Sequence, residues 1–201
     1  MKRTALILAG YSAVGKSTFL QWALFNQIPI FGEELRDDFL SFQLPSVWPE
    51  NRLSARQKLE EKTWLAGHNL YSIPEDHLPN KILLNLDLLS LHLRRPNANI
   101  SSAEFKKSYE EYLRTPALKG ACIAVNTVKR PFVTVCRQRD KRQMTADRRS
   151  KTTAVFFEAT EYAKSAFDNA YDAWHAAVRE ASCNIHLETS FDGLSFQIVE
   201  L

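Results

Sequence analysis

The chain has 201 residues, of which 45% are hydrophobic, and a net charge of +3 at pH 7. This size suffices for one substantial core, and so small a net charge does not by itself indicate nucleic-acid binding. The three cysteines lie far apart and the five histidines show no metal-ligand spacing, so neither structural disulfides nor a zinc site is expected. The apolar stretch before Gly10 spans only about five residues, too short for a secretory signal, and no other run approaches a membrane span. We therefore expect a cytoplasmic protein without a membrane partner.

The first predicted elements surround a glycine-rich loop. Thr4–Ala9 is an apolar run typical of a short buried strand, and apolar residues after Thr18 recur at helical spacing. Between them the sequence G-Y-S-A-V-G-K-S-T matches the phosphate-binding P-loop pattern. Its predicted nucleotide-binding residues are Gly10, Tyr11, Ser12, Ala13, Val14, Gly15, Lys16, Ser17 and Thr18.

Each part of this pattern has a physical task around a triphosphate. The glycines let the backbone amides surround the phosphates, and the following helix adds partial positive charge at its N-terminus. Lys16 would contact the β and γ phosphates, which makes it a catalytic candidate as well as a binding residue. The hydroxyl of Ser17 would ligate Mg²⁺.

The next segment contains acidic residues and little regular structure. Ile28–Phe31 resembles the entry of a second strand, and an acidic stretch follows it. A long loop with aromatic residues then continues through Pro49, and residues 56–66 have helical composition. Because long loops in compact domains are often functional, we expect residues 32–80 to form an insertion that builds an acceptor pocket.

A second apolar run, Lys81–Leu91, contains a candidate metal-site acid. Its first part resembles the Walker B pattern, in which a buried parallel strand ends at a carboxylate that orients Mg²⁺ or its water. Asp87 is the predicted acid. Since the apolar run continues beyond Asp87, a helix with Asp87 on its polar side is the alternative.

The remaining elements complete an alternation of strands and helices. A capping box, Ser101–Glu104, predicts the start of a helix, and Ala121–Val125 predicts a buried strand that ends at Asn126. Pro131 suits the first turn of a further helix. A long amphipathic helix is expected from roughly Thr153 to Ala181, followed by a last strand at residues 184–187. This order predicts an α/β fold with a parallel sheet and helices on both faces.

The loop sequence Gly10–Thr18 resembles that of the kinase-like branch of the P-loop NTPases, which holds nucleotide kinases and small-metabolite kinases such as shikimate and gluconate kinase. The resemblance implies one domain over residues 1–201, with three layers, a helical insertion and a parallel sheet of about five strands. It also implies that the phosphates lie at the carboxyl edge of the sheet, beneath a mobile lid that carries arginines.

The predicted lid is the basic segment of residues 129–151, whose nine Lys or Arg and two Asp give it a charge of +7. Guanidinium groups that close over a transferred phosphoryl group stabilise its charge and help exclude water. Arg139 and Arg142, three residues apart, would share one helix face and are the preferred pair. The other candidates are Arg137, Arg148 and Arg149. The alternatives are a solvated basic surface and a nucleic-acid patch, the latter disfavoured because the segment lacks interleaved aromatic residues.

The resemblance also implies an acidic residue after the second strand, where the shikimate and gluconate kinase group holds the acid that positions the acceptor hydroxyl and accepts its proton. Four acidic residues lie 17 to 22 residues after Lys16: Glu33, Glu34, Asp37 and Asp38. Glu33 and Asp37 would share one face of a helix, and either is a candidate base. A solvated acidic surface is the alternative.

These patterns together predict Mg²⁺-dependent transfer of the ATP γ-phosphoryl group to a small-molecule acceptor. The base-reading motif N-K-x-D and the switch motif D-x-x-G of GTPases do not appear, which favours ATP over GTP. A regulatory nucleotide switch that acts on a protein partner through the Trp48 loop or the long C-terminal helix is the alternative, with sulfonyl transfer a minor one. Nucleic acid is not an expected partner.

Overall fold

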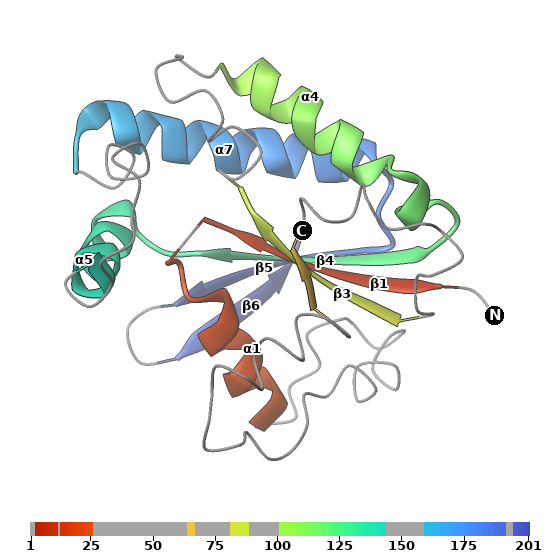
Figure 1. Ribbon diagram of the computed structural model, residues 1–201, viewed down its shortest axis with the longest axis horizontal. Coiled ribbons are helices and arrows are strands. Elements are labelled where there is room, and N and C mark those ends of the chain that lie inside the picture. The colour runs from red at the N-terminus through yellow and green to blue at the C-terminus, as the bar shows by residue number, and fades with distance from the viewer. Residues whose placement is uncertain are drawn as a thin grey trace.

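The computed structural model describes residues 3–11, 13–25, 64–66, 81–88, 101–143, 159–191 and 195–201. These residues form a six-stranded sheet with helices on both of its faces (Figure 1). The strand order is β2-β3-β1-β4-β5-β6. The first five strands in this order are parallel, and β6 is antiparallel to β5. The strands are β1 (Thr4–Gly10), β2 (Trp64–Ala66), β3 (Lys81–Asp87), β4 (Cys122–Lys129), β5 (Ile185–Phe191) and β6 (Phe196–Glu200).

The strand that leads into the glycine-rich loop, β1, lies inside the sheet between β3 and β4. Its apolar residues 5–9 are at most 1% exposed. Such complete burial is what a parallel strand requires when both faces of the sheet are covered. The predicted first strand is confirmed, with Gly10 as one further residue.

Four α-helices and one short 3-10 helix accompany the described strands. In Figure 1, α4 and α7 lie together on one face of the sheet, and α1 lies on the other. Helix α5 lies beyond the end of the sheet at which β1 leads into α1. The predicted α/β fold with helices on both faces is therefore confirmed, whereas the sheet has six strands and is only mostly parallel, because β6 is antiparallel. The helices are α1 (Lys16–Phe25), α4 (Ser102–Leu113), η5 (Pro116–Leu118), α5 (Phe132–Gln143) and α7 (Glu161–Glu180).

Side-chain caps set the beginnings of α4 and α7. The Ser101 hydroxyl accepts the Glu104 N–H at 3.2 Å, and the Glu104 carboxylate accepts the Ser101 N–H at 2.9 Å, which confirms the predicted capping box. At α7, the Thr160 hydroxyl accepts the Ala163 N–H at 3.1 Å. The apolar faces of the two helices meet where the rings of Tyr109 and Trp174 pack edge to face, with centroids 5.3 Å apart.

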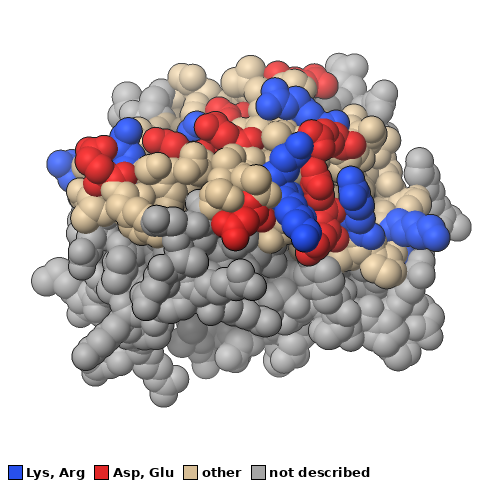
Figure 2. Space-filling view, turned by 90° about the horizontal axis from the view of Figure 1, so that it is seen from above, with Lys and Arg blue, Asp and Glu red and all other residues tan. Residues whose placement is uncertain are grey.

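The solvent side of α4 and α7 carries charges of both signs, which alternate over the surface shown in Figure 2. Lys106 contacts Glu180 at 2.5 Å, and Lys164 contacts Asp168 at 3.5 Å. The described residues of α4 and α7 therefore form a mixed-charge surface.

The second strand of the sheet differs from its prediction. Trp64–Ala66, at the end of a segment with helical composition, forms β2 and pairs with residues 83–85 of β3. Hydrogen bonding to β3 outweighs the weak local preference of these three residues for a helix. The predicted strand entry Ile28–Phe31 lies outside the described residues.

The fourth strand is longer than predicted, because its polar residues find partners inside the protein. Asn126 and Thr127 are fully buried in β4, and neither of them ends it. Thr189 donates to the Asn126 side-chain oxygen at 2.8 Å, and Trp174 donates to the Thr127 hydroxyl at 2.9 Å.

Two predictions near the C-terminus also change. Helix α7 begins at Glu161 and not at Thr153, since Ala159 and Thr160 precede it without helical structure, while residues 151–158 lie outside the described part of the chain. The last predicted strand, residues 184–187, continues to Phe191 as β5 and is followed by the unpredicted β6.

Candidate functional site

The glycine-rich loop lies at the carboxyl edge of the sheet, where β1 ends at Gly10 and α1 begins at Lys16. Gly10 has a φ of +151° and Gly15 a φ of +103°, values at which other residues are strained. A Cβ atom on Gly10 would lie 2.6 Å from the carbonyl oxygen of Val128 in β4. The path from strand to helix therefore requires glycine at both positions.

Backbone hydrogen bonds close the loop before the helix begins. The Val14 N–H donates to the Tyr11 carbonyl at 3.2 Å, and the Phe19 N–H donates to the Gly15 carbonyl at 2.8 Å. Ala13, which lies between Tyr11 and Val14 in the sequence, has a φ of +67°. The first N–H groups of α1 have no partner within the helix, so this end carries a partial positive charge at the loop.

The side chain of Lys16 lies inside the loop and not in solvent, because Lys16 is only 9% exposed. Its ammonium group donates to the carbonyl of Gly10 at 2.7 Å and to that of Tyr11 at 3.1 Å. The loop backbone thus positions a nearly buried cation beside its own first residues.

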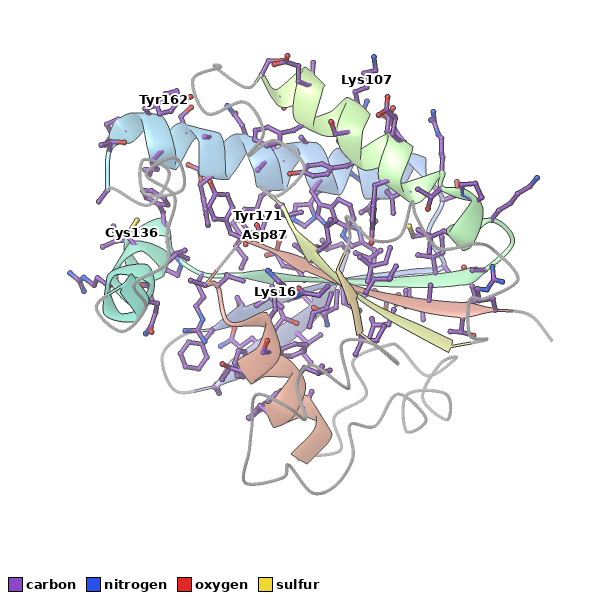
Figure 3. All side chains as sticks on the ribbon, viewed as in Figure 1. Lys16, Asp87, Lys107, Cys136, Tyr162 and Tyr171 are labelled. Atoms are coloured by element: carbon purple, nitrogen blue, oxygen red, sulfur yellow. The ribbon has the colours of Figure 1, made fainter. Side chains whose placement is uncertain are left out.

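Asp87 ends the neighbouring strand at the same edge. In the β1–β3 ladder Gly10 is paired with Asp87, and the Leu88 N–H donates to the Gly10 carbonyl at 3.2 Å. The prediction that a strand ends at Asp87 is confirmed, and the alternative of a helix there is wrong. Lys16 and Asp87 lie in the same region of Figure 3.

A tyrosine from α7 fastens the start of the loop to β4. The fully buried Tyr171 hydroxyl accepts the Tyr11 N–H at 3.2 Å and donates to the Val128 carbonyl at 2.7 Å. Burial raises the pKa of the Tyr171 hydroxyl well above its ordinary value, so it keeps the proton that it donates. The sequence placed Tyr171 only on the apolar face of a helix, and that pattern holds no signal for this contact.

Two cations at the end of β4 also face aromatic rings. The ammonium group of Lys129 lies 5.3 Å from the ring centroid of Tyr171, and the guanidinium carbon of Arg130 lies 4.1 Å from that of Phe191. A Cβ atom added to Gly15 would lie 2.9 Å from a terminal nitrogen of Arg130. Both residues belong to the predicted basic segment, but neither was singled out from the sequence.

The structure places only part of the remaining predicted set. Ser17 and Thr18 are exposed in the first turn of α1. The backbones of Arg139 and Arg142 lie in α5, whereas their side chains lie outside the described part of the structure. The other predicted residues outside it are Ser12, the four acidic residues Glu33, Glu34, Asp37 and Asp38, and Arg148 and Arg149.

Within the described residues, no group of three or more His, Cys, Asp or Glu side chains could hold a metal ion. Ser17 and Asp87 each offer one oxygen-bearing side chain at the loop. Mg²⁺ at a nucleotide site typically takes only one or two such protein ligands, because phosphate and water supply the others. In the same part of the chain, no helix is both long and apolar enough to cross a membrane.

Comparison with known proteins adds no family: no protein-family model matches the chain, and no curated protein matches its sequence. Chemical inference therefore rests on the loop itself. A nearly buried ammonium group, a helix N-terminus and a strand-end carboxylate meet at one edge of a parallel sheet. Such an arrangement can hold an anion together with a divalent cation.

Proposed function

We propose that the chain binds ATP with Mg²⁺ at Gly10–Thr18 and transfers the γ-phosphoryl group to a small-molecule acceptor. The observation that carries this proposal is the position of Lys16, whose ammonium group lies 2.7 Å from the Gly10 carbonyl within a loop between a buried strand and a helix. In the proposed complex, phosphate oxygens accept hydrogen bonds from this ammonium group and from the backbone amides that follow it.

The ends of the parallel strands support the metal part of the proposal. Asp87 is paired in register with Gly10, so its carboxylate begins one strand away from the loop. The hydroxyl of Ser17 in the first turn of α1 would ligate Mg²⁺, and Asp87 would hold a water of the ion. The bound metal would neutralise charge on the phosphates, while Lys16 positions them.

The proposed roles of the lid and of the base come from the sequence. Arg139 and Arg142 would close over the transferred group from α5, the helix that lies beyond the strand ends in Figure 1. Glu33 or Asp37 would accept the proton of the acceptor hydroxyl. These four residues complete the proposed reaction.

Label transfer tests the proposal directly. The full chain is incubated with ATP labelled in the γ-phosphoryl group, Mg²⁺ and a panel of sugars, nucleosides and hydroxy acids. We expect label to move to at least one acceptor. Release of inorganic phosphate alone, or tight binding of unchanged nucleotide, would contradict phosphotransfer and favour a regulatory switch.

A matched pair of lysine variants checks that any activity belongs to this loop. Lys16→Ala removes the ammonium group from the loop and is expected to abolish label transfer. Lys107→Ala removes the same charge from the exposed side of α4, at the top of Figure 3 and away from Lys16, and is expected to retain full activity. Equal activity in the two variants would place the reaction elsewhere.

A further inference from the structure

The first two residues of the basic segment, Lys129 and Arg130, are not part of a solvated surface. Lys129 and Arg130 are each about two-thirds or more buried, and each cation faces an aromatic ring. Because successive residues at a strand end point to opposite faces, Lys129 reaches Tyr171 of α7 while Arg130 reaches the side of α1. The two cations therefore lie on either side of the sheet edge that carries the loop.

Arg130 lies directly against the loop. A Cβ atom on Gly15 would lie 2.9 Å from a terminal nitrogen of Arg130 and 3.2 Å from the guanidinium carbon, so the guanidinium group occupies the space beside the Gly15 backbone. The ring of Phe191 faces this group with a centroid distance of 4.1 Å, and Phe196 supports Phe191 at 4.8 Å. The planar cation is thus held between an aromatic ring and the loop.

A buried guanidinium group carries a free-energy cost unless a negative charge or hydrogen-bond acceptors compensate it. The N-terminal end of α1 already brings positive charge to Gly15. Burial lowers the pKa of Arg130, and no carboxylate of the described residues pairs with it. Its Nε atom is buried and has no hydrogen-bond partner among them. Each of these costs would be offset by a negatively charged ligand at the loop.

The topology of the sheet brings Arg130 to the expected ligand crevice. β1 and β4 are neighbours at the middle of the sheet. β3 and then β2 lie beyond β1, whereas β5 and then β6 lie beyond β4, so the strand order changes direction between β1 and β4. Ligands of open α/β sheets bind outside the carboxyl ends of strands at such a switch point. The glycine-rich loop leaves from β1 at this point, and Arg130 leaves from β4.

We infer that Arg130 is a second cationic contact for the phosphate groups of the bound nucleotide, held ready by Phe191 and Gly15. This inference rests on the proposed function. It assigns to Arg130 a fixed position at the sheet edge, in contrast to the mobile arginines proposed for the lid. The recognised chemistry is a polyphosphate, whatever base or group is attached to it.

Calorimetric titration of the full chain with Mg·ATP and with inorganic tripolyphosphate tests the inference. Arg130→Gln removes the charge but keeps a planar polar group, and it is expected to raise the Kd for both probes about 10- to 100-fold, as loss of a charge-assisted contact does. The matched control is Arg114→Gln, which removes an arginine charge at an exposed position at the end of α4, away from the loop and the proposed lid. At about 150 mM salt its effect should stay within about twofold, because exposed distant charges are screened.

The possible outcomes separate this inference from the proposed function. If the unmodified chain binds neither probe, the proposed function fails and this inference with it. If the unmodified chain binds both but Arg130→Gln and Arg114→Gln change Kd equally, Arg130 is not a phosphate contact. Weaker binding of Mg·ATP with unchanged binding of tripolyphosphate would likewise overturn the phosphate assignment, since it would place Arg130 at the base.

Two further variants keep the test decisive if Arg130→Gln does not fold, which its thermal unfolding curve would reveal. Arg130→Lys keeps the charge but loses the planar fork, and Phe191→Leu keeps Arg130 but removes its aromatic support. Both are expected to raise Kd for tripolyphosphate by less than Arg130→Gln and by more than Arg114→Gln. Unchanged Kd values in both variants would overturn the inference.

Discussion

Tyr171 connects the longest described helix to the loop through a single buried hydroxyl. That oxygen accepts the Tyr11 N–H and donates to the Val128 carbonyl, so it joins α7, the loop and β4. Without it, a buried backbone donor and a buried backbone acceptor would lose their partner, at a cost of about 1 to 3 kcal/mol. We therefore regard Tyr171 as a positioning residue for the first turn of the loop.

The substitution Tyr171→Phe tests this role. It should lower the free energy of unfolding by about 1 to 3 kcal/mol and raise the Kd for Mg·ATP several-fold, because the loop start is no longer held. The matched control is Tyr109→Phe, which removes a buried hydroxyl that donates to the Leu88 carbonyl at the end of β3. Chemical denaturation and calorimetric titration measure the two effects. Equal losses of affinity in both variants would reduce Tyr171 to a purely structural residue.

At the scale of residues, the sequence predicts the loop well and its surroundings poorly. The spacing of Gly10, Gly15 and Lys16 follows from what one short segment must do, and the structure places all three at a turn from strand to helix. Arg130 and Tyr171 meet the loop only after β4 and α7 have packed. Helical or strand periodicity assigns such residues to a face, but it contains no information on which distant atom the end of the side chain meets.

At the scale of elements, a chain of two histidines and a glutamate joins α7 to β5. His175 Nδ1 lies 3.3 Å from His186 Nε2, and His175 Nε2 lies 3.0 Å from the Glu188 carboxylate. Burial, together with the neighbouring His175 and Arg179, lowers the pKa of His186 to about 4, while Glu188 opposes this shift. His186 is therefore neutral in the folded protein near pH 6, where an unfolded chain begins to protonate it.

This difference makes stability depend on pH in a defined window. As pH falls below about 6.5 the unfolded chain takes up a proton on His186, while the folded chain does not until about pH 4. The contribution of His186 to stability is thus complete above pH 6.5 and is lost on the way to pH 4. Between pH 7 and 5 this amounts to about 2 kcal/mol of unfolding free energy.

Urea denaturation at a series of pH values measures this loss. In His186→Gln the side chain no longer titrates, so its unfolding free energy should fall by about 2 kcal/mol less between pH 7 and 5 than that of the unmodified chain. Contact with His175 lowers the pKa of Glu188, whose own contribution is lost only below about pH 4.5 and so lies outside this range. Parallel pH profiles for the two proteins would show that His186 titrates normally in the fold.

The elements themselves could be predicted where local physics decides them. The capping box at Ser101 and the apolar strand β1 depend on neighbouring residues, and both are confirmed. Trp64–Ala66 forms a strand because β3 offers it a partner. β4 continues through Asn126 and Thr127 because Thr189 and Trp174 donate hydrogen bonds to their side-chain oxygens. Such partners come from distant parts of the chain, so the local pattern predicted a helix in one case and a strand end in the other.

At the scale of the whole molecule, the sheet concentrates charge at one edge. The interior of β1 is apolar and buried, whereas Asp87 ends β3, and Lys16 and Arg130 follow β1 and β4 at the same edge. The sheet and the helices on both faces hold these groups on a rigid base. We propose that this edge binds a nucleoside triphosphate with Mg²⁺ through the glycine-rich loop.

Thermal unfolding with and without Mg·ATP tests that claim most directly. A ligand present at about 100 times its Kd stabilises the folded state by about 2.7 kcal/mol, which for a domain of this size raises Tm by about 5 to 10 °C. We expect that rise for the unmodified chain and for Lys107→Ala, and no rise for Lys16→Ala. An unchanged Tm of the unmodified chain at millimolar Mg·ATP, or an equal rise in Lys16→Ala, would contradict the assignment of the nucleotide to this loop.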